Sequence, residues 1–334
     1  MNNRYKIFLF LILLFGTYLL GMICGKYKIF PYGYLQAIKT RMGDKKLHPW
    51  PKEFSIIEID KEQKAYFYQA KGSNPQPLAV VLHTWSGDYT QYYGSLAEVV
   101  LDKNWNYIHP DFRGANNKPE ACGSDLVISD IDKAIDYAIA HANVDLERIY
   151  VIGCSGGGYA TLCMFMKSRH RIKTFSAWVA ISDLRSWYRQ SLGRRNSFAE
   201  DILQSTSSSE GTLNVVEATR RSPMYQKTPV AKLEYARLKL YAGIHDGYTG
   251  SVPITQSLLF FNKVVQDLPQ YQKEDLISEG EILQLLTDRY KIKDCFLGKI
   301  GHREIIFQKK VKNISIVIFE GGHEILEEYA MEDL

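Results

Sequence analysis

A serine flanked by small residues stands where a β-prone segment gives way to a helical one. Residues 153–157 read GCSGG, with Ser155 at the centre, and they follow the apolar run 148–152. The pattern GxSxG between a strand and a helix is typical of a nucleophile elbow, which exposes a serine hydroxyl at a tight turn. Such a hydroxyl becomes a strong nucleophile when a base and amide donors lie beside it. A glycine-rich turn that only packs a helix on a sheet is the alternative interpretation.

Two later segments supply an acid and a histidine. Asp246 follows the alternating β-prone run 238–242 and lies in a loop, where an α/β sheet presents functional groups. His323 follows the apolar run 314–319, in the sequence Glu-Gly-Gly-His-Glu. Asp246 would orient His323, and His323 would take the proton of Ser155. The order serine, acid, histidine is the one expected for α/β-hydrolases, so these residues are the predicted catalytic triad.

Other side chains compete for these roles. Asp183 also follows an apolar run, 175–181, although Ser182 or Asp183 is better suited to cap the next helix. His302 has a glycine beside it, but it precedes a β-prone run instead of following one. His245 is next to the predicted acid and is a candidate substrate-binding residue in the wall of the pocket.

An oxyanion hole needs a second amide besides that of Gly156, the residue after the nucleophile. The apolar run 78–82 leads into HTWSG at 83–87, where lipases and esterases carry a histidine-glycine motif. Thr84 stands where that motif has glycine. By position, the backbone N–H of Trp85 is the predicted second donor, and its indole would form a wall of the pocket.

With these motifs, the chain resembles the α/β-hydrolase superfamily, and within it the prolyl-oligopeptidase-like and acetyl xylan esterase-like branches. The resemblance covers about residues 54–330 and rests on HTWSG at 83–87, DFRG at 111–114, GCSGG at 153–157, GIHD at 243–246 and GH at 322–323. It implies an α/β-hydrolase fold, with a mostly parallel central sheet and helices on both faces. Asp111 and Arg113 lie in a loop where that branch uses them mostly for structure, and substrate binding by Arg113 is the alternative.

Strands that alternate with helices predict the sheet that must carry these residues. An antiparallel pair is expected first, at 54–59 and 65–68. The expected core strands are 78–82, 107–109, 149–152, 175–179, 238–241 and 315–319, and the expected helices are 89–103, 128–142, 158–168 and 255–266.

Two segments exceed this minimal fold and are expected to decide specificity. Residues 184–228 occupy the place where a lid commonly sits, and they contain Trp187 and Tyr188 together with several arginines. Aromatic and arginine side chains can hold a sugar or an anion, so Trp187 and Tyr188 are candidate substrate-binding residues. A solvated helical cap without substrate contact is the alternative. Residues 271–313, with a β-prone run at 305–307, predict a small accessory unit for recognition or docking.

The amino terminus carries a charge-free apolar run at 7–25 between basic residues. This is close to the length of about 20 residues that spans a bilayer. Residues 1–30 are therefore the predicted signal anchor or signal peptide, 31–53 a linker, and 54–334 the catalytic domain. No A-x-A-like cleavage site follows the run, which favours an uncleaved anchor with the catalytic domain outside the cytoplasm. Secretion, or release to the periplasm after cleavage, is the alternative.

Composition excludes several classes of function. The formal net charge is +4, from 41 basic and 37 acidic residues, which is too balanced to imply a nucleic-acid partner. The five cysteines have no metal-ligand spacing, so neither a metal nor a cofactor is expected.

Three functions remain open at this point. The first is a serine carboxylesterase of the acetylesterase type, which deacylates a carbohydrate or another small polar ester through an acyl-enzyme. The second is a serine peptidase of the prolyl-oligopeptidase-like type; such relatives usually carry a large β-propeller, and the residues before 54 are too few to form one. The third is a hydrolase-fold binding protein that has lost catalysis.

Overall fold

The computed structural model describes residues 10, 13–21, 50–209, 211–292 and 295–334. The chain divides into two compact units, residues 1–49 and 50–334. In the first unit, residues 13–21 are helical, while most of the predicted anchor at 1–30 and of the linker at 31–53 lies outside the described residues. Among the helices that are described, none is both long and apolar enough to cross a bilayer.

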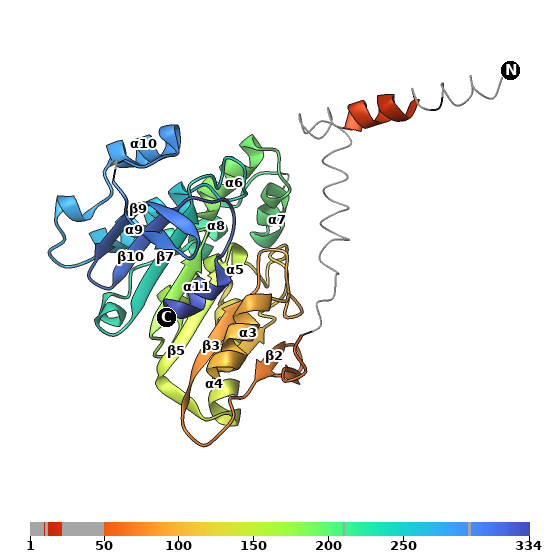
Figure 1. Cartoon of the computed structure of the whole chain (residues 1–334), viewed down its shortest axis with the longest axis vertical. Helices are drawn as coiled ribbons and strands as arrows, with labels where there is room; N and C mark the ends of the chain where they lie inside the picture. The colour runs from red at the N-terminus through yellow and green to blue at the C-terminus, as the bar shows by residue number, and fades with distance from the viewer. Residues whose placement is uncertain (1–9, 11–12, 22–49, 210, 293–294) are drawn as a thin grey trace. The chain divides into compact units, whose positions relative to one another are not determined.

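The second unit is built on a central sheet (Figure 1). Within the described residues, this sheet has ten strands. Their order is β1-β2-β4-β3-β5-β6-β7-β10-β9-β8. The strands are β1 Ser55–Glu58, β2 Lys64–Tyr68, β3 Gln76–Leu82, β4 Asn106–Pro110, β5 Val144–Cys154, β6 Thr174–Trp178, β7 Arg237–Gly243, β8 Lys299–Ile300, β9 Arg303–Val311 and β10 Ile314–Phe319. The central strands from β4 to β10 in this order run parallel, and antiparallel strands complete both edges.

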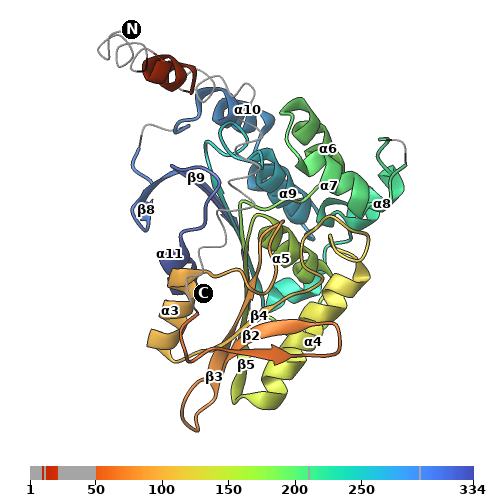
Figure 2. The same cartoon turned by 90° about the vertical axis from the view of Figure 1, so that its right-hand side faces the viewer.

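Helices cover both faces of the sheet because its buried strands are apolar on both sides. Along β3, Leu78, Val80 and Leu82 join one hydrophobic cluster, and Ala79 and Val81 join the other. Figure 2 shows α3 and α11 on one face, with α4, α5 and α9 on the opposite face. The described helices are α3 Gly94–Lys103, α4 Asp125–His141, α5 Gly156–Lys167, α6 Leu184–Gly193, α7 Phe198–Ser205, α8 Val215–Arg221, α9 Thr255–Gln266, α10 Glu279–Asp288 and α11 Glu327–Glu332.

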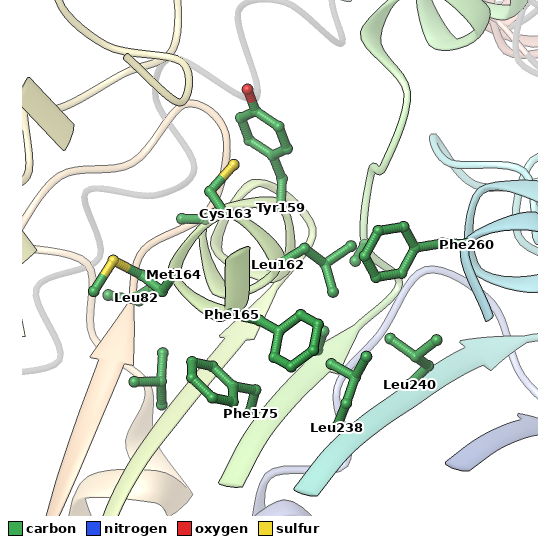
Figure 3. Packing of buried hydrophobic residues seen from close by; sticks show 14 of the residues in the cluster. Leu82, Tyr159, Leu162, Cys163, Met164, Phe165, Phe175, Leu238, Leu240 and Phe260 are labelled. Atoms are coloured by element: carbon green, nitrogen blue, oxygen red, sulfur yellow. The ribbon is translucent and has the colours of Figure 1, made fainter. Parts of the chain in front are cut away.

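Packing fixes α5, the helix that follows the predicted elbow, on the sheet. Its side chains Leu162 and Phe165 are buried over Phe175 of β6 and Leu238 of β7 (Figure 3). Removing each such side chain from water contributes about 1.5–3 kcal/mol. The first turn of α5 therefore has a well-defined place at the carboxyl end of β5.

The α/β-hydrolase fold predicted from the sequence is confirmed, with the expected antiparallel pair at its beginning. One strand differs from expectation. The β-prone run 305–307 lies inside β9, which pairs antiparallel with β10 and therefore extends the central sheet. This part of the predicted accessory unit at 271–313 belongs to the core architecture, because Ile306 and Phe307 are buried in it.

Candidate active site

Ser155 lies at the junction of β5 and α5 with backbone angles that are unusual for a serine. Its φ is 58° and its ψ is −115°, so the residue is in the sparsely populated positive-φ region. The Ser155 amide donates to the Trp178 carbonyl at 2.9 Å, which holds this strained turn against β6. A Cβ at Gly153 would lie 2.1 Å from the Gly157 carbonyl oxygen, so only glycine permits the chain to turn back so closely.

The three predicted triad residues form one hydrogen-bonded chain. His323 Nε2 lies 2.8 Å from Ser155 Oγ, and His323 Nδ1 lies 2.7 Å from Asp246 Oδ2. The Asp246 side chain is fully buried, and the imidazole is 22% exposed. These residues follow β5, β7 and β10, whose parallel carboxyl ends lie at one edge of the sheet. In this arrangement, Nδ1–H donates to Asp246, and Nε2 is left to accept the serine proton.

The second oxygen of Asp246 is held by the backbone of its own loop. Asp246 Oδ1 accepts hydrogen bonds from the Gly247 amide at 2.8 Å and the Val252 amide at 3.0 Å. Each carboxylate oxygen thus has its own donor, with Oδ2 left for His323. The arrangement fixes the carboxylate plane, which in turn orients the imidazole toward Ser155.

The loop that carries His323 is held by contacts that the sequence did not indicate. Glu324 accepts from the Gly322 amide, and both of its carboxylate oxygens accept from Arg303 Nη2 at 2.9 Å. Glu327 accepts from two backbone N–H groups in the first turn of α3. Burial raises the pKa of Glu327. These two carboxylates tie the chain that follows the histidine to β9 and α3.

The amides of Trp85 and Gly156 lie next to each other. A Cβ on Gly156 would lie only 2.3 Å from the Trp85 backbone nitrogen. In the part of the chain that the structure describes, neither amide donates to a protein acceptor. A neighbouring segment holds the Trp85 backbone in place, because the Trp85 carbonyl accepts a hydrogen bond from the backbone N–H of Asn116 at 2.8 Å. Two adjacent N–H groups without a protein acceptor, one of them on the residue after the serine, are the elements of an oxyanion hole.

The indole of Trp85 is not an open wall of the pocket, as the sequence had suggested. The side chain is 2% exposed. It packs edge-on against Trp187 of α6, with ring centroids 4.7 Å apart, and its Nε1–H donates to Asp201 of α7 at 3.0 Å. The helices of segment 184–228 therefore bury the ring. They supply both the apolar contact and the hydrogen-bond acceptor that a buried indole needs.

Trp187 and Tyr188 serve the packing of the insertion in this structure. Trp187 is 1% exposed, lies nearly parallel to Phe198, and donates from Nε1 to the Ser251 carbonyl at 3.0 Å. The Tyr188 hydroxyl donates to the Gly211 carbonyl at 3.2 Å. The polar groups of both candidate substrate-binding residues thus donate to backbone carbonyls.

The remaining sequence candidates also have structural partners. Arg113 pairs with Asp130 at 2.6 Å and with Glu62 at 2.5 Å, and the Asp130 hydrogen bond holds the pKa of this guanidinium above its usual value. His245 pairs through Nε2 with Glu320 at 2.7 Å. Both side chains therefore pair with carboxylates outside the triad.

The two alternative triad candidates occupy other sites. Asp183 is the N-cap of α6, where it accepts from the Arg185 and Ser186 amides, as the sequence had favoured. His302 is exposed in the turn between β8 and β9. Neither side chain is hydrogen-bonded to Ser155 or His323.

Comparison with known proteins agrees with this fold. The model of the prolyl oligopeptidase family matches residues 93–276. No curated protein sequence matches the chain.

Several solved structures share the fold. An acylaminoacyl peptidase from Pyrococcus horikoshii is 18% identical, with a TM-score of 0.58 over 88% of this chain and 41% of its own. A puromycin-hydrolyzing peptidase from Mycobacterium tuberculosis is 16% identical, with a TM-score of 0.51 over 64% and 34%. Prolyl oligopeptidase B from Galerina marginata is 12% identical, with a TM-score of 0.52 over 66% and 33%. The chain thus spans between 33% and 41% of the length of these structures.

Proposed function

The chain belongs to the prolyl oligopeptidase family of serine hydrolases, and we propose that it hydrolyses carboxylic esters through an acyl-enzyme on Ser155. The hydrogen-bonded series from Ser155 through His323 to Asp246 carries this proposal. It supplies a nucleophile, a base within reach of its proton, and an acid that fixes the base. No step of this chemistry calls for a metal or a cofactor.

Acylation follows from the positions of these groups. As Ser155 Oγ attacks the ester carbonyl carbon, His323 Nε2 takes the hydroxyl proton. The amides of Trp85 and Gly156 donate to the oxyanion of the tetrahedral intermediate. Asp246 accepts from Nδ1–H and stabilises the imidazolium that forms. The intermediate collapses when His323 returns the proton to the leaving alcohol oxygen, which leaves the acyl group on Ser155.

Deacylation repeats these steps with water as the nucleophile. His323 removes a proton from water as its oxygen attacks the acyl carbon, and the same two amides hold the new oxyanion. Protonation of Ser155 Oγ then releases the carboxylic acid. The same residues therefore serve both steps.

The charges around the triad support a neutral substrate over a peptide held by its terminus. A peptide terminus is bound through a free carboxylate or a free cation. Three carboxylates near the site are instead engaged with partners of the protein: Asp201 of α7 with Trp85, Glu320 with His245, and Glu324 with Arg303. A small polar ester, such as an acetylated carbohydrate, needs no such charged anchor.

A peptide bond is the second candidate substrate. The family match favours it, as do the solved peptidases that share the fold. The triad geometry suits both reactions, because His323 could protonate a leaving amine as well as an alcohol.

The proposal is tested by turnover measurements on the full-length protein in detergent. An unactivated acetylated sugar, a longer acyl ester and a blocked peptide of similar size are compared, because activated esters are cleaved by peptidases as well. We expect the highest kcat/KM for the acetylated sugar and no measurable turnover by Ser155→Ala. Ser197→Ala is the control, since this exposed serine makes no capping hydrogen bond. Peptide turnover above ester turnover would contradict ester specificity.

We also propose that residues 1–30 hold the enzyme at a membrane, with the hydrolase unit outside the cytoplasm. The apolar run at 7–25 supports this location. In cells, the intact chain should remain in the membrane fraction after an alkaline wash, and external protease should digest it. A chain that is released with a new amino terminus beyond residue 25 would indicate a cleaved signal peptide instead.

A further inference from the structure

Arg194 follows α6 in the insertion, and its guanidinium contacts the loop that carries the triad acid. Nη1 donates to the Gly247 carbonyl at 3.1 Å and the Gly250 carbonyl at 3.2 Å, and Nη2 donates to the Ser251 carbonyl at 2.7 Å. Nε donates to the Gln190 carbonyl at 3.0 Å, within its own helix. One side chain therefore links α6 to three peptide groups of loop 247–251.

This loop closes over the acid and the base. A Cβ on Gly250 would lie 2.3 Å from Asp246 Oδ1 and 2.7 Å from His323 Cβ. The Gly250 backbone is thus in direct contact with both residues, and a small movement of the loop would change the room available to the carboxylate and the imidazole. The Gly247 amide also donates to Asp246 Oδ1, so the segment that Arg194 holds is the same one that holds the acid.

The guanidinium is suited to this task by its shape and its charge. Its rigid planar fork presents several N–H groups in fixed directions, whereas an ammonium is a compact point charge. Among the described residues, no carboxylate lies within ion-pair distance of Arg194, so its hydrogen bonds go to backbone carbonyls. Burial lowers the pKa of Arg194, and the negative charge of Asp246 acts in the opposite direction.

A second contact from the same helix reaches the same loop. Trp187 Nε1 donates to the Ser251 carbonyl at 3.0 Å. The insertion thus reaches Ser251 with two side chains, one from the middle of α6 and one from its carboxyl end. This arrangement supports the loop from outside the pocket.

We propose that Arg194 is a positioning residue, which holds loop 247–251 against the Asp246–His323 pair and thereby keeps the imidazole aligned with Ser155. The inference rests on the proposed triad. The insertion at 184–228 would then help catalysis by positioning Asp246. This role is separate from any contact of the insertion with substrate.

Arg194→Met tests this role, because it removes the donors but keeps much of the apolar stem. We expect kcat to fall about 10- to 100-fold, as for a positioned catalytic group that loses its alignment, while KM changes by less than about threefold. Arg194→Lys should recover part of the loss, because an ammonium can still donate to some of the carbonyls. Arg189→Met is the matched control, since Arg189 is exposed on the same helix. Thermal unfolding shows which variants are folded, and the lysine variant carries the test if the methionine variant is not.

A double-mutant cycle separates this role from a merely structural one. In an Asp246→Asn background, Arg194→Met should lower the rate of Ser155 labelling by a fluorophosphonate far less than it does in the wild type, because the acid through which it acts is already impaired. An equal loss in both backgrounds, an unchanged kcat, or an effect on KM alone would overturn the inference. Retained activity in Ser155→Ala would instead overturn the proposed function on which it rests.

Discussion

Replacing Gly156 with alanine tests whether the Trp85 and Gly156 amides act on one oxyanion. The φ of Gly156 lies outside the left-handed region, so alanine is acceptable to the backbone and only space is at issue. The added Cβ would lie 2.3 Å from the Trp85 nitrogen and 2.4 Å from its Cα. Carbon contacts need about 3.5–4.0 Å, so one backbone segment must move by about 1 Å or more.

That movement is large on the scale of the proposed chemistry. Oxyanion donors must lie about 2.7–3.1 Å from the developing charge, and removing one costs about 10²–10³ in kcat, or about 2.7–4 kcal/mol. Trp85 cannot move freely, because its carbonyl accepts from Asn116 and its indole donates to Asp201. We therefore expect Gly156→Ala to lose about 10²-fold or more in kcat, with a smaller change in KM.

The assay is steady-state hydrolysis of the acetyl ester, with thermal unfolding measured in parallel. Gly193→Ala is the control, because its Cβ would meet nothing within 4 Å and its activity should be unchanged. A folded Gly156→Ala protein with kcat within about threefold of the wild type would refute the reasoning, since the two amides would then not share the oxyanion.

Three further changes probe the insertion at 184–228 and the identity of the triad acid. Asp201→Ala leaves a buried indole N–H without an acceptor, so it should lower the unfolding free energy by about 1–3 kcal/mol in chemical denaturation, whereas Asp201→Asn keeps an acceptor. The hydrogen bond from Arg220 lowers the pKa of Glu217 from 4.5 to about 2, so its stabilisation is complete above the unfolded pKa and is lost as pH falls through the folded pKa. Glu217→Gln should therefore be less stable than the wild type by about 1 kcal/mol at pH 7, after allowance for solvent screening, with the difference vanishing toward pH 2 in denaturation curves. Asp183→Asn should keep its turnover within about threefold, because asparagine also caps helices, whereas Asp246→Asn should lose about 10⁴-fold in kcat; the reverse result would identify Asp183 as the acid.

The sequence predicted the features that depend on local pattern. The elbow at 153–157 was predicted because small residues around a serine, between an apolar run and a helix, are typical of a tight strand-to-helix turn. Asp246 and His323 were found because each follows a β-prone run in a recognisable chain order. The core strands were predicted for the same reason, since buried parallel strands are almost continuously apolar.

Features that depend on long-range contacts were not predicted. Arg194 and Asp201 lie in a segment whose arginines and aromatics suggested substrate binding, but the fold directs these two side chains to loops far away in the chain. Trp187 gave the same misleading signal, because an aromatic side chain suits a packed core as well as a binding surface. The run 305–307 has clear β propensity, yet only its pairing with β10 assigns it to the central sheet.

The most direct test of the account is covalent labelling of the folded, full-length protein with a fluorophosphonate, followed by peptide mapping. The account predicts one labelled serine, Ser155, with labelling abolished in Ser155→Ala and strongly slowed in His323→Ala. Absence of label on Ser155 in folded protein, or labelling that persists unchanged in Ser155→Ala, would contradict the claim that this serine is the nucleophile.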